Sequence, residues 1–217
     1  MAHLKRHKIP KTWPIARKGT TFVVRPNFAL DRGMPLLVLL RDVLKVAQNR
    51  KEVKMVIHAK NILVNNKEAR NDKNNVVLFD TIAIVPSEKY YRLGMSDKGK
   101  FRLDEIEEKE INNKVSKIVD KKVLRGKKTQ LNLSDGMNFI TDVKCNVGDS
   151  VLINFKDKKV EKCLPLIEKT QVFVFAGKHA GKEGVLRKLK PERKMASITV
   201  GDENINVLIK QLMVVEK

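Results

Sequence analysis

The sequence predicts a protein built from several small domains of α+β type, and three observations carry this prediction. Near the amino terminus, two apolar patterns at helical spacing are followed by a hairpin pattern. The middle of the chain is a series of short β-rich runs separated by turns that contain glycine. Residues 166–217 hold four to five short strand patterns and no helical one, which is typical of a small SH3-like barrel. A chain of 217 residues is long enough for two or three such domains.

The dominant global property is positive charge. The chain has 45 Lys and Arg against 25 Asp and Glu, a net charge of +20. A field of that sign attracts polyanions, and nucleic acid is the usual one because each neutralised phosphate releases a counterion. An anionic membrane is the rival partner, but the apolar run Leu36–Leu40 stops at Arg41, far short of the roughly 20 residues that span a bilayer. No apolar signal-peptide segment follows MAHLKRHK, so we expect a cytosolic protein with reduced cysteines.

Residues 1–34 are predicted to form a basic arm. The first 30 residues hold seven basic side chains and no acidic one, and Pro10, Pro14 and Pro26 break any helix. The favoured interpretation is an extended arm along RNA, with stacking by Trp13. The alternatives are a solvated, mobile terminus, or packing of Trp13 on the neighbouring domain. The arm residues expected to touch RNA are Lys5, Arg6, Lys8, Lys11, Trp13 and Arg17.

Residues 35–93 are predicted to form a module of two helices and a hairpin. Pro35 suits the first position of a helix, and an apolar face runs from Leu36 to Ala47. Asn49 and Glu52 form a capping-box-like pair that begins a second helix. Asn65-Asn66 tolerates positive φ and predicts a tight hairpin turn. A binding face, rather than a merely solvated one, is expected from Arg50, Lys51, Lys54, Lys60, Lys67, Arg70 and Lys73.

Residues 94–165 are predicted to form a central β-rich domain whose chemistry the sequence does not specify. Before it, Val76–Val85 reads as one long β run, and Glu105–Ile111 as a short acidic helix. A hairpin is expected from Tyr91–Met95 to Lys100–Leu103 across Ser96-Asp97-Lys98-Gly99. Further strands are expected at Lys114–Val119, Gln130–Leu133 and Ser150–Phe155.

The loop between Val174 and Val185 interleaves Gly177, Gly181 and Gly184 with basic side chains. A nucleotide-binding loop needs G-x-x-x-x-G-K-[ST] before a helix. Here the glycine spacing is one residue short, Glu183 stands at the hydroxyl position, and a strand pattern follows. The loop is therefore predicted to be a basic turn between two barrel strands, with Lys178, His179 and Lys182 facing RNA.

No catalytic or metal-binding constellation is visible in the sequence. The four histidines lie at spacings that fit neither a metal site nor a base beside a nucleophile. Cys145 and Cys163 lack partners at zinc spacing and are expected to be small core residues. We therefore expect no cofactor, no metal and no small-molecule substrate.

Five segments together resemble one known family. HLKRHKIPKTW (His3–Trp13), PLLVLLRDVLK (Pro35–Lys45) and AGKHAGKEG (Ala176–Gly184) are similar to small-subunit ribosomal protein four of the archaeal and eukaryotic type, the "S-four-e" family. RLGMSDKGKFRL and VGDSVLI in the middle of the chain look like that family's central domain. The motifs occur in the family's order, and the resemblance extends over essentially the whole chain.

The resemblance implies an arm, an S-four-type RNA-binding module, a central β domain and a C-terminal KOW domain. It also implies a structural role in the small ribosomal subunit in the cytoplasm, with ribosomal RNA and neighbouring ribosomal proteins as partners. Carried over by position, the module's RNA face comprises Arg41, Arg50, Lys51, Lys54, Lys60, Lys67 and Arg70. One departure is Asn65-Asn66, where the family usually has a glycine in the hairpin.

Two other functions stay open at this point. S-four-type modules also occur in RNA-modifying enzymes, which need a further catalytic domain, and no segment is left unassigned for one. A transcription-associated KOW factor would contact a polymerase, and its association would survive removal of RNA.

Overall fold

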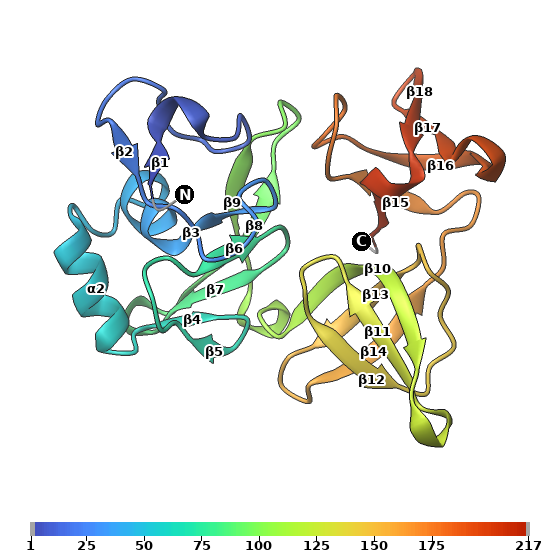
Figure 1. Cartoon of the computed structure of the whole chain (residues 1–217), viewed down its shortest axis with the longest axis horizontal. Helices are drawn as coiled ribbons and strands as arrows, with labels where there is room; N and C mark the ends of the chain where they lie inside the picture. Colours follow the sequence, from blue (N-terminus) through green and yellow to red (C-terminus); the bar gives the residue numbers. More distant parts are fainter. Residues whose placement is uncertain (1–2, 216–217) are drawn as a thin grey trace. The chain divides into compact units, whose positions relative to one another are not determined.

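The computed structural model describes residues 3–215, and the chain is mostly β with few helices (Figure 1). It divides into two compact units. Unit 1 runs to Met95 and resumes from Lys100 to Asn112, whereas unit 2 takes Ser96–Gly99 and continues from Asn113. The finer boundaries at residues 34, 93 and 165 stay a prediction.

Unit 1 contains a five-stranded antiparallel sheet in the order β5-β4-β7-β8-β9. Its strands are β4 (Ile62–Val64), β5 (Lys67–Glu68), β7 (Thr81–Ile84), β8 (Lys89–Met95) and β9 (Phe101–Glu105). Two smaller antiparallel pairs accompany this sheet in the described part of the unit. One joins β3 (Gly33–Pro35) to β6 (Asn75–Val77), and the other joins β1 (Leu4–Lys5) to β2 (Phe22–Val23).

The helix predicted to begin at Pro35 is shorter and more buried than expected. A turn of α-helix, α1 (Leu36–Val38), continues as a π-helical turn, η2 (Leu39–Val43), and Lys45 then adopts a positive φ of 56°. All five residues from Leu36 to Leu40 are buried. The prediction of one apolar face reaching Ala47 was wrong, because this segment is covered on every side and the chain turns at Lys45.

The second helix, α2 (Arg50–His58), begins where the sequence predicts. The Asn49 side chain accepts a hydrogen bond of 3.0 Å from the Glu52 backbone N–H, and the Glu52 carboxylate accepts one of 2.7 Å from the Gln48 N–H. These bonds satisfy backbone donors at and before the start of the helix. The capping prediction is confirmed.

The hairpin turn at Asn65-Asn66 is also confirmed, since both residues have positive φ between β4 and β5. The run Val76–Val85, in contrast, is not one strand. Phe79 has a φ of 64°, and the Asp80 carboxylate accepts a 2.7 Å hydrogen bond from the Val77 N–H, so the chain turns between β6 and β7. The acidic segment predicted as a helix holds only a 3-10 turn, η4 (Glu108–Glu110).

Unit 2 contains two five-stranded antiparallel sheets. The first has the order β12-β11-β10-β13-β14, with β10 (Asn113–Val123), β11 (Thr129–Leu133), β12 (Asn138–Thr141), β13 (Ser150–Asn154) and β14 (Lys159–Leu164). Three of these strands match predicted ones, whereas β12 and β14 were not predicted. Ile118, Leu131, Val151 and Ile153 are buried in its core.

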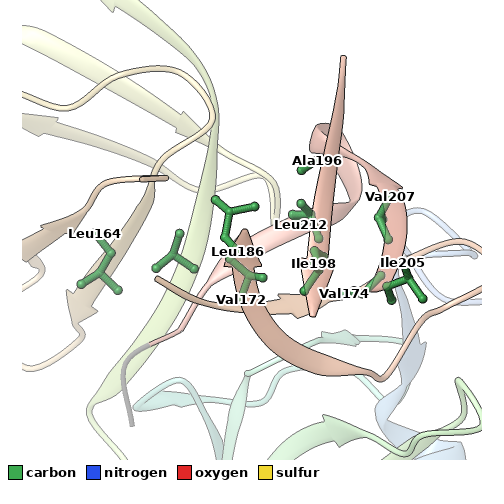
Figure 2. Close-up of a cluster of buried hydrophobic side chains, with 10 residues drawn as sticks. Leu164, Val172, Val174, Leu186, Ala196, Ile198, Ile205, Val207 and Leu212 are labelled. Carbon is green, nitrogen blue, oxygen red and sulfur yellow. The ribbon is translucent and has the colours of Figure 1, made fainter. Parts of the chain in front are cut away.

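The second sheet has the order β18-β17-β16-β15-β19, so the last strand returns to pair with the first. Its strands are β15 (Gln171–Val174), β16 (Glu183–Lys190), β17 (Met195–Val200), β18 (Glu203–Leu208) and β19 (Leu212–Val214). Alternate residues of these strands, among them Val172, Leu186 and Ile198, form a buried aliphatic core (Figure 2). The remaining short turns are η1 (Arg6–Lys8), η3 (Val85–Ser87), η5 (Arg125–Lys127), η6 (Pro191–Arg193) and η7 (Ile209–Gln211).

Side chains of the first sheet hydrogen-bond to the backbone of the second. The buried Lys117 ammonium on β10 donates to the carbonyls of Ile209 and Leu212, the latter at 2.7 Å. The Ser150 hydroxyl on β13 accepts a 2.9 Å hydrogen bond from the Val214 N–H. Burial lowers the pKa of Lys117 from its ordinary value of 10.5 to about 8. These bonds connect β19 of the second sheet, and the turn before it, to the first sheet.

Candidate nucleic-acid interface

The amino-terminal segment is folded and not an extended arm. It forms β1, η1 and β2 within unit 1, and a loop is closed by Arg6. The Arg6 guanidinium donates hydrogen bonds of 2.8 Å to the carbonyls of Ala16 and Thr20, and one of 2.7 Å to the Thr20 hydroxyl. The prediction of an extended arm was wrong, because these bonds bend the chain back on itself. Arg6 shapes the loop with the same donors that were predicted to reach phosphate.

Trp13 is not available to stack on a base. Its side chain is only 2% exposed, and its indole N–H donates a 2.9 Å hydrogen bond to the Gly33 carbonyl. The neighbouring Thr12 carbonyl accepts a 2.8 Å bond from the Phe101 N–H at the start of β9. The stacking role is therefore corrected, and the alternative of packing onto the adjacent domain holds. The segment's other predicted contacts, Lys5, Lys8, Lys11 and Arg17, are exposed.

The amino-terminal half of α2 carries three basic residues and one acidic residue, Glu52. Arg50, Lys51 and Lys54 lie on this helix, and the two lysines are exposed. Cations in a first turn oppose the helix macrodipole, so this placement does not serve helix stability. The backbone donors at this end are capped by Asn49 and Glu52, so the exposed lysine side chains are what favours an anion here. Lys67 on β5 and Arg70 after it are also exposed.

Three of the predicted RNA-contacting residues in this module form ion pairs with carboxylates. Arg50 forms a 2.6 Å ion pair with Asp72, whose side chain is 3% exposed. Arg41 pairs with the adjacent Asp42 at 2.9 Å, and Lys60 pairs with Glu68 at 3.1 Å. The Arg41 and Lys60 pairs are solvent-accessible and worth about 0–1 kcal/mol each, so a phosphate can replace the carboxylate. Arg50 is tied more firmly, because leaving Asp72 buried and unpaired is costly.

The glycine-rich loop between β15 and β16 owes its shape to positive-φ backbone at Gly177 and Gly181, with φ of 92° and 94°. Gly184 serves a different purpose: a Cβ there would lie 2.4 Å from the Thr199 carbonyl oxygen on β17. The loop connects β15 to β16 as a turn: the Gly181 N–H donates a 2.8 Å hydrogen bond to the Val174 carbonyl, and the Val174 N–H donates one of 3.0 Å to the Lys182 carbonyl. No helix follows the loop, so it is a turn between strands, as predicted.

The three basic residues of this loop differ in their surroundings. Lys178 is exposed, and His179 is half-buried. Lys182 lies 3.7 Å from the Glu203 carboxylate on β18, a long and weak pair. Of the three, Lys178 is thus the side chain most available to bind a phosphate.

Two features of the basic surface were not predicted from the sequence. Asp72 holds Arg50 across 22 residues of chain, and no local pattern signals such a pair. Arg187 and Lys188 on β16 are both exposed although they are adjacent. The signal for them was present: the in–out alternation of a strand breaks at this point, which indicates a β-bulge.

The described residues offer few features of catalytic chemistry. Within residues 3–215, no cluster of three or more His, Cys, Asp or Glu side chains could hold a metal ion. Burial and the neighbouring Cys145 thiol raise the pKa of Cys163 to about 12, so its thiol stays protonated. No helix in the described part of the chain is long and apolar enough to cross a membrane.

Two family models match the sequence: "Ribosomal family S4e" over residues 87–160, and "RS4NT (NUC023) domain" over residues 2–28. The fold is similar to that of the 30S ribosomal protein S4e of Thermoplasma acidophilum. That match has a TM-score of 0.73 at 24% identity, over 85% of this chain and 95% of the other.

Curated relatives extend the similarity over nearly the full length. The small ribosomal subunit protein eS4 of Methanocella arvoryzae is 38% identical over 91% of this chain and 85% of its own. That of Haloarcula marismortui is 33% identical over 96% of this chain and 88% of its own. The resemblance first carried by five short segments thus holds across the whole alignment, and the chain belongs to the S4e family of ribosomal proteins.

Proposed function

We propose that this protein is a structural constituent of the small ribosomal subunit and binds ribosomal RNA there, in the cytoplasm. The observation that carries the proposal is the 38% identity over 91% of the chain to a protein named small ribosomal subunit protein eS4. The net charge of +20 supplies the physical basis for binding a polyanion. Neighbouring ribosomal proteins are the other proposed partners.

Phosphate contacts supply most of the affinity in this proposal, and they come from exposed cations. The direct donors are Lys5, Lys8, Lys11, Arg17, Lys51, Lys54, Lys67, Arg70 and Lys178. A second set exchanges a carboxylate partner for phosphate on binding: Arg41, Lys60 and Lys182. His179 adds a hydrogen-bond donor, while Arg6, Trp13 and Arg50 position the segments that carry the donors.

The domain assignment follows the same proposal. Residues 35–93 act as the S-four-type module, which the capped α2 and the Asn65-Asn66 hairpin support. Residues 94–165 act as the central β domain, and residues 166–217 as the KOW domain of SH3-like form. Support for the last comes from the five-stranded sheet and its glycine-rich turn.

The role is structural and not enzymatic in this proposal. An RNA-modifying enzyme with an S-four-type module needs a catalytic domain besides it, whereas the relatives named as ribosomal proteins align over most of their own length. A KOW-type transcription factor is the second alternative, and its main partner would be a polymerase and not the ribosomal subunit.

Cosedimentation tests the proposal. The full chain should travel with small ribosomal subunits at low salt, and RNase treatment of the subunits should release it. Sedimentation as free protein at low salt would contradict the ribosomal role. Association with a polymerase that survives RNase would favour the transcription factor.

A further inference from the structure

The outward face of β16, β17 and β18 carries an open hollow of about 570 Å³. Three cations, Arg187, Lys188 and Lys190, line it together with Ser197, Asn204 and Asn206, and Glu168 contributes a single carboxylate. The hollow lies on the opposite side of the strands from the aliphatic core drawn in Figure 2. None of these residues was among the RNA contacts predicted from the sequence.

A β-bulge creates this concentration of charge. Leu186 pairs with Ile198 and Lys188 pairs with Ser197, so Arg187 is an extra residue with no partner in the register. In a regular strand, adjacent side chains point to opposite faces. Here the bulge keeps Leu186 in the core while both Arg187 and Lys188 are exposed. Lys190, two residues beyond Lys188, extends the basic row along the strand by about 6.6 Å.

The polar side chains opposite the cations present donors. The Ser197 hydroxyl donates a 2.6 Å hydrogen bond to the amide oxygen of Asn206, and the Thr199 hydroxyl donates one of 2.9 Å to that of Asn204. Each amide oxygen thus already accepts one hydrogen bond, whereas each Nδ2 amino group offers two N–H donors to a ligand. Amide and cationic N–H groups converge on one hollow, which suits an anionic ligand rich in oxygen acceptors.

We propose that this hollow is a second RNA-binding surface of the protein, separate from the glycine-rich loop, and that it grips the sugar–phosphate backbone. The three cations contact phosphates, and the asparagine amides donate to 2′-hydroxyl and phosphate oxygens. Glu168 accepts from a 2′-hydroxyl. No aromatic side chain lines the hollow, so it reads backbone shape and not base identity. This inference rests on the proposed ribosomal RNA binding and adds to it the surface and the part of the RNA recognised.

Replacement of the three cations by uncharged glutamine tests their role. In the full chain, Arg187→Gln, Lys188→Gln and Lys190→Gln are combined. Binding is measured to protein-free small-subunit ribosomal RNA, and hydroxyl-radical footprints are recorded. The matched control combines Lys122→Gln, Lys144→Gln and Lys156→Gln, which removes equal charge from exposed positions elsewhere in unit 2. The hollow variant should bind about tenfold or more weaker than the control, with the salt slope reduced by about 2–3. One footprint patch should disappear.

A second variant tests the amides without changing charge. Asn204→Ala with Asn206→Ala should leave the salt slope unchanged. The same variant should reduce the preference for the footprinted RNA segment over DNA of identical sequence. Melting temperatures of all variants within a few degrees of the parent show that the fold is intact.

The outcomes distinguish failure of the proposed ribosomal RNA binding from failure of the inference about the hollow alone. If the parent chain does not bind the ribosomal RNA, the proposed function fails and this inference fails with it. If the parent binds but the hollow variant matches the control, only the inference is overturned. Unchanged RNA binding together with lost binding to a poly-glutamate peptide would instead assign the hollow to an acidic protein segment.

Discussion

Asn65 shows how much one residue can fix locally. It is 7% exposed, has a φ of 51°, and sits in the turn between β4 and β5. Its amide donates a 2.8 Å hydrogen bond to Asp80 and accepts one of 3.0 Å from the Thr81 N–H. The side chain therefore pins the hairpin to the neighbouring strand, a function that glycine could not perform.

Substitution of Asn65 separates the contribution of its side-chain hydrogen bonds from that of its tolerance of positive φ. Asn65→Gly should lower the free energy of unfolding by about 1–3 kcal/mol, because the side-chain hydrogen bonds are lost. Asn65→Ala should lose about 1 kcal/mol more, because alanine is strained at positive φ. Urea denaturation measures both, with the exposed Asn66→Gly as the control that changes little. Equal losses for alanine and glycine at position 65 would show that the backbone strain is negligible.

Lys117 makes a pH-dependent contribution to stability. Its pKa is about 8 in the folded chain and near 10.5 when unfolded, so between these values the unfolded state binds more protons. Stability should therefore rise with pH across this window, by up to about 3 kcal/mol from this group alone. Lys117→Met should lack this rise. The difference between parent and variant unfolding energies from pH 7.5 to 10.5 isolates it from other titrating groups, and parallel curves would contradict the assignment.

At the scale of elements, the amino-terminal segment behaves as part of unit 1. Trp13 is the chain's single tryptophan, so its fluorescence reports on this segment alone. Emission should be blue-shifted in the folded protein and unchanged when RNA is added, since no face of the indole is open. Trp13→Ala should cost roughly 3–5 kcal/mol of stability. Quenching by RNA in the intact protein would return Trp13 to a stacking role.

Elements encoded by neighbouring residues could be predicted from the sequence, and those set by distant partners could not. The Asn49 cap, the Asn65-Asn66 turn and the glycine-rich loop each follow from a few adjacent residues. Distant bonds add to the local ones at the two places where the prediction was wrong: Asn65 donates to Asp80 at the break in Val76–Val85, and Trp13 donates to the Gly33 carbonyl in the amino-terminal segment. The basic surface shows the same division: exposed lysines and the broken alternation at Arg187 can be seen in the sequence, whereas the Arg50–Asp72 pair required the fold.

At the scale of the whole molecule, the excess of positive charge is distributed over both units. Basic residues of α2 and the amino-terminal segment lie in unit 1, and those of the glycine-rich loop and β16 lie in unit 2. Such a distribution allows an RNA to be held by many phosphate contacts that are individually weak. The affinity of the whole chain should accordingly depend steeply on salt.

Measurement of RNA affinity at several salt concentrations tests this expectation. With about 6–10 phosphate contacts, the association constant should fall roughly 10³–10⁵-fold between 50 and 200 mM monovalent salt. A thermal melt at each salt concentration is the control, since the fold should persist while the RNA dissociates. Dilution back to low salt should restore binding. A nearly flat dependence would mean that apolar or base contacts dominate, and the phosphate-centred interface would then be wrong for both units.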